Sequence, residues 1–254
     1  MQTGAITGYI DVAQVALYTF WLLFAGLIFY LRTEDKREGY PLVTERPGHM
    51  VQGFPPVPAP KTFLLASGAV VQAPRQGGVE PTFDAVPAAG FPGAPLQPMG
   101  NPMLSGTGPA ASALRADVPD LMYASSQNRV VPLRVAADHG VDDESPNPIG
   151  QEVIAADGAV GGIVSDLWID RAETAIRYLE VTLAAGASIL LPMPLANVDA
   201  TGRVFVKSVL ASQFLDAPTL AHPDQVTLRE EDRIQAYFAS GHLFAVPSRM
   251  EPML

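Results

Sequence analysis

The first hydrophobic pattern in the chain is one long apolar run near its N-terminus. Residues 12–31, VAQVALYTFWLLFAGLIFYL, carry no formal charge, and six of the next seven residues, RTEDKRE, are charged. A bilayer core of about 30 Å needs about 20 helical residues. The pattern therefore predicts a transmembrane helix over residues 12–31.

The flanks of this run distinguish an anchor from a cleaved signal. A secretory signal has a basic n-region, an apolar run of about 7–15 residues and a small-residue cleavage site, whereas residues 1–31 contain no Lys or Arg. We therefore expect an uncleaved anchor. Lys and Arg collect on the cytoplasmic side of a span, and here they follow it. Residues 1–11 are thus expected in the periplasm, and residues 32–254 in the cytoplasm.

Short strand-like segments follow one another from residue 130 onward. They include VVPLRVA, GGIVSDLWID, AIRYLEVTL and RVFVKSVL, and the pairs Asp157-Gly158, Ala185-Gly186 and Thr201-Gly202 supply turn residues between several of them. Such spacing is typical of antiparallel hairpins and predicts a small closed barrel or a sandwich.

One helix is expected after the strands, over about residues 227–239. Thr227 and Glu230 have the spacing of a capping box at its start, and Gly241 offers a C-cap. The acidic residues 230–232 suit the positive end of a helix dipole.

The segment between the anchor and the strands, residues 32–129, is rich in Pro and Gly. Between Pro41 and Ala110 lie 14 of the 24 Pro and 10 of the 22 Gly, a density that excludes long helices and central strands. A disordered linker is one interpretation. Because apolar clusters such as KTFLLASGAVVQAP and LMYASSQNRVVPLRVA interrupt the segment, we favour an extended, ordered ribbon that packs on partner subunits.

Composition removes several classes of function. The net charge of −10 disfavours a nucleic-acid partner, and the absence of Cys excludes disulfides, thiolate nucleophiles and Cys-ligated metals. The four His, at 49, 139, 222 and 242, form no local metal-ligand pair. The sequence also lacks the G-x-S-x-G and P-loop motifs, so no enzyme activity is expected.

Several unrelated motifs occur together in one order along nearly the whole chain. They are REGYPL directly after the anchor, PKTFLL, GNPMLSGTGPAAS, VVPLRVA, SDLWIDRAETAIRYLEV, LLP and VTLREEDRIQAYFASGHLFA. In these motifs the chain resembles the H subunit of the purple-bacterial photosynthetic reaction centre. Its GGIVSDLWID, IRYLEV and ILLP segments also resemble the PRC-barrel domain, which a ribosome-maturation family shares.

The resemblance implies a fold and a set of partners. The fold would be one N-terminal transmembrane helix, an irregular Pro/Gly-rich segment, and a mainly-β cytoplasmic domain over 130–254 with a PRC-type small antiparallel barrel and one C-terminal helix. The chain would bind no pigment. It would cap two multi-span L- and M-type subunits that hold bacteriochlorophyll, bacteriopheophytin, quinones and non-haem iron in the intracytoplasmic part of a bacterial inner membrane. Light-harvesting antenna and a cytochrome subunit stay open as further partners.

Such a subunit would stabilise the quinone sites and deliver protons to the secondary quinone. Carboxylates suit this relay because burial or neighbouring charges move their pKa. By resemblance, Glu173 is the acid of this path, with Asp170 and Arg177 around it in the turn between two strands. From the residues alone, the same turn reads as a solvated loop with a surface ion pair. The full candidate set is Glu173, Asp170, Arg177, Glu230, Asp117 and Asp120, of which Glu230 is better explained by helix capping.

One departure from the family concerns the proton entrance. Some members carry a surface histidine pair there that also binds inhibitory metals, whereas the matching residues here are 122–127, MYASSQ. The entrance is therefore expected at Asp117, at Asp120 or elsewhere, and inhibition by zinc or cadmium is expected to be weak.

Four residues after the anchor lie at the depth of lipid headgroups. Arg32, Lys36, Arg37 and Tyr40 are expected to contact an anionic lipid or a neighbouring subunit, although the three basic residues equally fit a role in setting topology alone. A membrane-tethered PRC-barrel adaptor outside photosynthesis is the alternative for the whole chain. It would share the anchor and barrel but not the REGYP and GNPM motifs.

Overall fold

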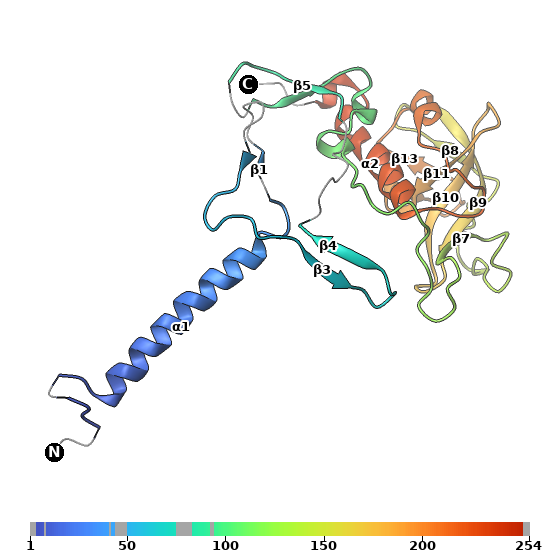
Figure 1. Ribbon diagram of the computed structural model, residues 1–254. Coiled ribbons are helices and arrows are strands. Elements are labelled where there is room, and N and C mark those ends of the chain that lie inside the picture. Colours follow the sequence, from blue (N-terminus) through green and yellow to red (C-terminus); the bar gives the residue numbers. More distant parts are fainter. Residues whose placement is uncertain are drawn as a thin grey trace. The chain divides into compact units, whose positions relative to one another are not determined.

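The computed structural model describes residues 4–7, 9–40, 42–43, 50–74, 83–91 and 94–250 (Figure 1). The chain forms two compact units. The first comprises Met1–Glu80 with Gly90–Ala94, and the second comprises Pro81–Ala89 with Pro95–Leu254. The Pro/Gly-rich segment, expected as one ribbon, is thus divided between the units.

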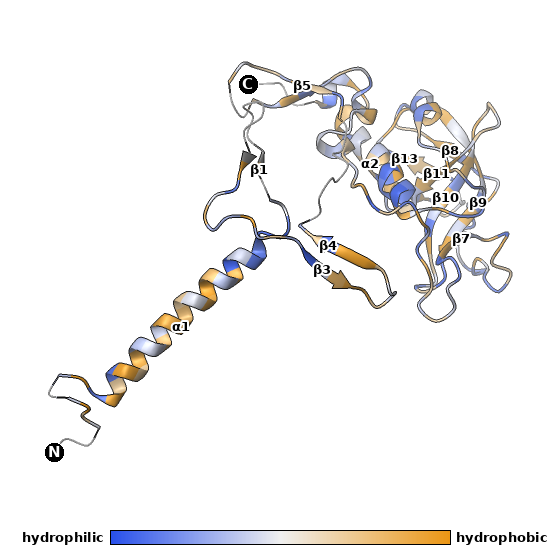
Figure 2. Cartoon of the chain, in the orientation of Figure 1, coloured by the Kyte–Doolittle hydropathy of each residue, from blue (hydrophilic) through white to orange (hydrophobic). Residues whose placement is uncertain are grey.

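The first unit is built on a long apolar helix. It contains α1 (Val12–Asp35) and two antiparallel hairpins, β1 (Leu42–Val43) with β2 (Met50–Val51) and β3 (Lys61–Leu64) with β4 (Val70–Ala73). Among the described residues, α1 is the one helix long and apolar enough to cross a bilayer. None of its residues is buried within the chain, and Figure 2 colours much of its length as hydrophobic.

The start of α1 follows from its capping residues. Asp11 Oδ1 accepts a hydrogen bond from the Gln14 amide at 2.7 Å, and the Gln14 side chain accepts one from the Asp11 amide at 3.2 Å. These contacts satisfy two donors that a helix start leaves unpaired. The helix continues to Asp35, four residues beyond the predicted span. At about 36 Å it exceeds the hydrocarbon thickness, so its last turn projects into the polar region.

The second unit is centred on a seven-stranded sheet. Its strands are β7 (Val130–Pro132), β8 (Glu152–Ile154), β9 (Val160–Asp170), β10 (Ala175–Thr182), β11 (Ser188–Pro192), β12 (Ala196–Val198) and β13 (Val204–Val206). The order is β11-β10-β9-β8-β13-β12, and β7 also pairs with β9. Because the path ends at β11 and β12, the sheet is open, and it curls into a half-barrel rather than the closed barrel that the strand spacing predicted (Figure 1).

The predicted hairpins are confirmed. Gly158, Gly186 and Gly202 have φ values of 77°, 84° and 85°, a left-handed conformation that glycine adopts at low cost. The antiparallel description fails at one place, because β13 pairs parallel with β8, with Val204 opposite Val153. These strands belong to two separate hairpins, which leaves their relative direction free.

The helix α2 (Leu228–Phe244) packs against the sheet. Its core contacts include the fully buried side chains of Ile234, Tyr237 and Phe238. The capping box is confirmed, because Thr227 Oγ1 accepts from the Glu230 amide at 3.1 Å and Glu230 accepts from the Thr227 amide at 2.8 Å.

The predicted end of this helix was wrong. The helix runs to Phe244, and Gly241 lies inside it rather than at its C-cap, which is Ala245. The glycine serves close packing instead, because a Cβ at Gly241 would lie 2.5 Å from the Ser208 carbonyl oxygen.

Short elements complete the second unit. They are β5 (Ala85–Pro87) with β6 (Leu96–Pro98), and the 3-10 turns η1 (Pro102–Leu104), η2 (Gly108–Ala110), η3 (Met193–Leu195), η4 (Ala211–Asp216) and η5 (Pro247–Arg249). Met103 and Ala110 are buried, and η1 and η2 contact α2. Val130, Val131 and Ala136 are also buried in this unit. The GNPM…GPA motif and the VVPLRVA part of the second apolar cluster thus pack on this chain. Leu121 and Tyr123 at the start of that cluster are exposed, so packing on a partner stays a prediction for them.

Candidate functional site

The predicted acidic turn lies around a guanidinium that the sequence did not single out. Arg129 Nε donates to Asp170 Oδ1 at 2.9 Å, and its Nη2 lies 2.8 Å from Asp170 Oδ2. The same Nη2 donates to Glu173 Oε1 at 2.6 Å, and Nη1 lies 3.4 Å from Asp120 Oδ2. We call Arg129, Asp170, Glu173, Asp120 and Arg177 the Arg129 cluster.

Strand pairing brings the two central members, Arg129 and Asp170, close together. Arg129 directly precedes β7, and Val130 pairs with Asp170 at the end of β9. Backbone bonds continue the contact on both sides, from the Arg171 amide to the Arg129 carbonyl at 3.0 Å and from the Arg129 amide to the Asp120 carbonyl at 2.8 Å. The cluster is therefore fixed by main-chain structure, not only by side-chain charge.

Asp170 is the buried end of the cluster, with no exposed side-chain surface. Its Oδ1 also accepts from the amides of Ala172 at 2.9 Å and Glu173 at 3.2 Å. Burial by itself raises the pKa of Asp170, but the bonds from Arg129 and these two amides outweigh it, so the pKa is lowered overall. Asp170 is ionised at neutral pH.

The second oxygen of Asp170 has ionic neighbours without a well-aligned hydrogen bond. Oδ2 lies 2.8 Å from Arg129 Nη2 and 3.7 Å from Arg177 Nε. It therefore keeps capacity to accept a bond from water.

The turn that presents Glu173 is tight. It spans the four residues between β9 and β10, and Thr174 has a φ of 53°. A β-branched residue rarely adopts this conformation, so the turn carries local strain. The Glu173 side chain is 56% exposed and that of Asp170 is fully buried. The cluster thus connects solvent to the interior within one turn.

The remaining two candidates, Asp117 and Glu230, lie at the start of α2. Thr227 Oγ1 donates to Asp117 Oδ1 at 2.8 Å, and Arg229 Nη1 lies 3.3 Å from Asp117 Oδ2. Glu230 Oε1 accepts from the Ala221 amide at 2.8 Å. These carboxylates line a cleft of about 440 Å³ together with Thr227 and Arg229. Glu230 acts as a capping residue here, as its sequence position suggested.

An open groove of about 850 Å³ lies beside the Arg129 cluster. It is lined by Gln127, Asn128 and Arg171, which neighbour the cluster in sequence, and by His222 and Asp224. His222 also lines the cleft at the start of α2. Water therefore has room next to both groups of candidate residues.

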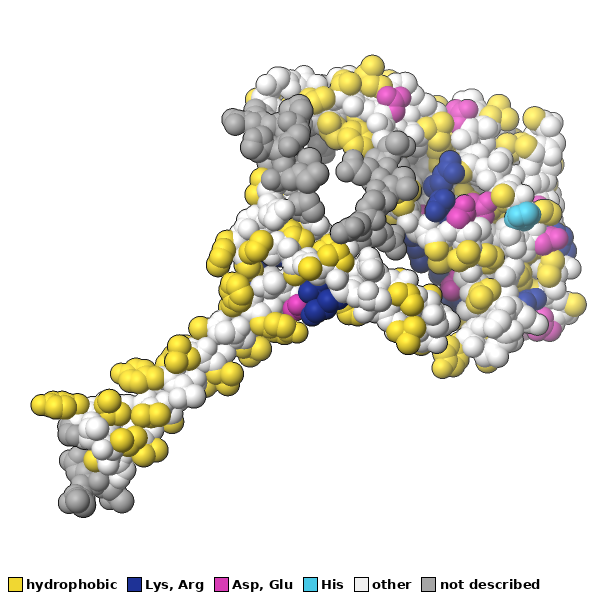
Figure 3. Space-filling view, viewed as in Figure 1, with side chains coloured by type: hydrophobic (Ala, Val, Ile, Leu, Met, Phe, Trp, Pro, Cys, Tyr) yellow, Lys and Arg dark blue, Asp and Glu magenta, His cyan; other side chains and the backbone are white. Residues whose placement is uncertain are grey.

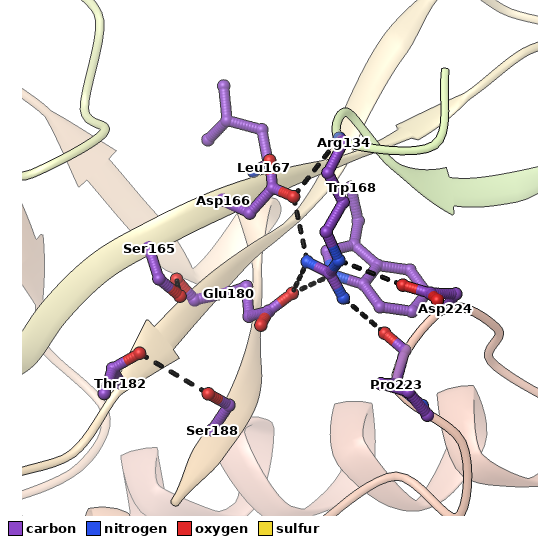
Figure 4. A network of polar contacts seen from close by, with 10 residues as sticks. All are labelled: Arg134, Ser165, Asp166, Leu167, Trp168, Glu180, Thr182, Ser188, Pro223 and Asp224. Carbon is purple, nitrogen blue, oxygen red and sulfur yellow. Dashed lines mark hydrogen bonds and ion pairs between the residues drawn. The ribbon is translucent and has the colours of Figure 1, made fainter. Parts of the chain in front are cut away.

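A second arginine network, which the sequence did not single out, joins the segment that follows β7 to the rest of the barrel (Figure 4). Arg134 Nη1 donates to Asp166 at 2.9 Å and to Glu180 at 2.7 Å, and Nε donates to Asp224 at 2.9 Å. Glu180 also accepts from Trp168 Nε1 at 2.8 Å. Because these bonds tie the barrel to the loop before α2, we assign this network to structure.

The basic residues after the anchor are mostly engaged within the chain. Lys36 is 1% exposed, and its Nζ donates to the carbonyls of Gln52, at 2.6 Å, and Pro55. The ammonium of Lys36 is therefore held by this chain's own backbone, and its contact with a lipid or a neighbouring subunit stays a prediction.

Arg37 is similarly enclosed. It pairs with Glu34 at 2.8 Å and donates to the carbonyls of Ala59 and Ala73 at 2.7 and 3.0 Å. Its side chain is 10% exposed, and its contact with a lipid or a neighbouring subunit stays a prediction as well. Arg32, bonded to the Tyr40 hydroxyl at 3.4 Å, stays a prediction together with Tyr40. Figure 3 shows basic and acidic side chains gathered where the apolar helix ends.

Across the described ranges, no group of three or more His, Asp or Glu side chains is placed to hold a metal. His139 Nδ1 lies 3.0 Å from the Asp138 carboxylate, a contact between neighbours in sequence. His49 lies outside the described residues.

Two comparisons with known protein families match the chain. Residues 4–135, just over half of the 254, match the family described as photosynthetic reaction centre, H-chain N-terminal region. Residues 142–212, which include β8 to β13, match the PRC-barrel domain. The first match implies association with other reaction-centre subunits and, with the apolar α1, with a membrane. The chain belongs to the H-chain family of the photosynthetic reaction centre.

Proposed function

We propose that this chain caps the cytoplasmic side of two pigment-binding subunits of L and M type and delivers protons to the secondary quinone. The observation that carries the proposal is the Arg129 cluster, in which an exposed carboxylate and a buried one share a guanidinium. A relay needs such a sequence of polar groups because quinone reduction consumes protons at a site covered by protein. Pigments, quinones and iron would be held by the other subunits.

The charges around the anchor support the orientation. No Lys or Arg precedes α1 in the sequence, and Arg32, Lys36 and Arg37 follow its apolar part. Under the positive-inside rule, the N-terminus lies in the periplasm and the barrel in the cytoplasm. The membrane would be the bacterial inner, intracytoplasmic membrane.

Asp120 is the better candidate for the proton entrance. Its carboxylate is 41% exposed and lies 3.4 Å from Arg129 Nη1, within reach of the cluster. Asp117 is bonded instead to Thr227 and Arg229 at the start of α2. We therefore place the entrance at Asp120 and Glu173, and give Asp117 and Glu230 a structural role.

The test is made in the assembled complex. Glu173→Gln is expected to slow transfer of the second electron to the quinone, because that step is coupled to proton uptake. Glu144→Gln is the matched control, since Glu144 is exposed and lies outside the cluster. Flash-induced kinetics equal to those of the parent complex across about pH 5–9 would remove Glu173 from the path.

The adaptor alternative is tested by purification. The reaction-centre role requires that bacteriochlorophyll and two larger multi-span chains copurify with this chain from the native membrane. A colourless preparation without those chains would favour an adaptor outside photosynthesis.

A further inference from the structure

We propose that the β3–β4 hairpin is a second membrane contact, and that its tip, residues 64–70, inserts among phospholipids at the membrane interface beside α1. The proposal concerns a surface that the proton path and the barrel do not use. It does not depend on the reaction-centre partners.

The base of the hairpin is fixed to the C-terminal end of α1. Lys61 and Ala73, the paired residues at its open end, both contact that helix end: Lys61 Nζ lies 2.7 Å from Glu34, and the Ala73 carbonyl accepts from Arg37 at 3.0 Å. Lys61 also lies over the ring of Tyr30, 5.9 Å from its centroid. These contacts hold the base at the level where the span leaves the hydrocarbon.

The side chains of the hairpin change from polar near its base to apolar at its tip. Lys61 and Gln72 lie near the base, whereas Leu64 and Val70, which are paired, lie at the tip. Residues 62–74 contain no charged side chain. All four residues of β3 are exposed, and in β4 Val70 and Gln72 are exposed whereas Val71 and Ala73 are half-buried, so no residue of the two strands is fully covered by the described part of the chain. Figure 2 shows the apolar character of the hairpin.

This gradient fits a lipid surface better than a protein surface. A strand that packs on a protein core alternates between buried apolar and exposed polar residues, and β3 and β4 do not separate the two kinds by face. A membrane interface accepts apolar side chains from both faces of a tip while the base stays in the polar layer.

The backbone of the tip is compatible with this position. The Leu65 amide donates to the Ala69 carbonyl at 2.8 Å, and the Gly68 amide donates to the Leu65 carbonyl at 2.9 Å, so the turn satisfies its own bonds. The outer edges of a two-stranded hairpin keep unpaired groups, which the hydrocarbon core does not tolerate. The tip therefore lies at the boundary of headgroups and acyl chains and no deeper.

The tip also continues an apolar surface that begins on the span. Phe54, 82% exposed, lies against Phe29 of α1 with the ring centroids 5.9 Å apart. Phe63 and Leu65 are exposed on the hairpin. Aromatic side chains at this depth are typical of the membrane–water interface.

The absence of Cys makes the test direct, because one introduced thiol carries one label. The full chain is reconstituted without partner subunits in phospholipid bilayer discs, with a nitroxide at Leu64→Cys. Leu22→Cys in α1 is the lipid reference and Leu215→Cys in the second unit is the water reference. In the parent chain these leucines are exposed to similar extents, 76%, 76% and 65%. Val70→Cys, opposite Leu64, repeats the measurement on the other strand.

The labels are compared by collision with oxygen, which concentrates in lipid, and with a nickel chelate, which stays in water. We expect the Leu64 and Val70 labels to favour oxygen, as the Leu22 label does, and to stay so after assembly with the pigment-binding subunits. Labels that favour the nickel chelate in discs, like that at Leu215, would overturn the proposal. Labels shielded from both only after assembly would overturn it too, and would assign the tip to a protein partner. Assembly is followed separately by the absorption spectrum, so either result leaves the proposed function to be judged on its own.

Discussion

Arg129 and Asp170 are 41 residues apart in the sequence, yet they form a two-point ion pair, with Nε 2.9 Å from Oδ1 and Nη2 2.8 Å from Oδ2. The pair arises because β7 lies beside the end of β9. The ion pair keeps the buried carboxylate of Asp170 ionised, and this negative charge acts on every other member of the Arg129 cluster.

The first prediction concerns acid stability. Folding lowers the pKa of Asp170 below its unfolded value of about 3.9, so the stability it contributes is fully present above that pH and is lost as pH falls through the folded pKa. Asp170→Asn should cost about 1–3 kcal/mol near neutral pH and flatten the loss of stability below about pH 4.

Denaturant unfolding of the detergent-solubilised chain at several pH values measures this effect. Asp143→Asn is the control, because Asp143 is exposed and lies outside the cluster. Arg129→Lys should fall between the parent and Asp170→Asn, since Lys keeps the charge and loses the two-point geometry. If the stability of Asp170→Asn fell as steeply at acidic pH as that of the parent, Asp170 would not be the group responsible.

The second prediction concerns the packing of α2. An alanine in place of glycine usually stabilises a helix by about 1 kcal/mol. At Gly241 the sign should reverse, because the new Cβ would meet the Ser208 carbonyl oxygen at 2.5 Å, and the expected loss is about 1–3 kcal/mol.

Thermal unfolding of Gly241→Ala tests this reversal. Gly140→Ala should leave the midpoint unchanged, because nothing lies within 4 Å of a Cβ there and its φ is not positive. A stabilised Gly241→Ala variant would show that the helix and the 208–209 segment lie farther apart.

The third prediction concerns the junction after the anchor. Lys36→Met keeps the apolar stem and removes the donor to the Gln52 and Pro55 carbonyls, so one partly buried and one buried acceptor lose their partner. The expected cost is about 1–3 kcal/mol. Hydrogen exchange over residues 51–60 should quicken, whereas exposed Arg32→Met should leave it as in the parent. Equal exchange in both variants would return Lys36 to a purely topological role.

The fourth prediction concerns metal ions. Zinc or cadmium at micromolar concentration should leave second-electron transfer in the assembled complex nearly unchanged, because residues 122–127 contain no imidazole. The described residues also contain no cluster of ligands. Strong inhibition in the same flash assay would mean that the proton entrance lies elsewhere than Asp120.

Local signals in the sequence were enough to predict where several helices and hairpins begin or end. Val12 begins α1 as predicted, Thr227 and Glu230 form the capping box, and the glycines at 158, 186 and 202 close hairpins. Each of these depends on contacts within a few residues, which a sequence displays directly.

Contacts between distant segments account for what the sequence did not reveal. Arg129 could not be assigned because its partners follow from the register of β7 on β9. Lys36 looked like a topology charge because its acceptors, 16 and 19 residues away, are backbone carbonyls that carry no residue-type signal. Gly241 was misread as a cap because its reason is the approach of the 208–209 segment.

The parallel pairing of β8 with β13 also imposes an order on biogenesis. About 170 residues separate the end of α1 from the end of β13, so at typical translation rates the anchor is complete about 10–30 s before the last inner strand exists. During this interval β8 exposes an unpaired edge. The nascent chain is then most open to aggregation or chaperone capture, and slower translation would lengthen that exposure.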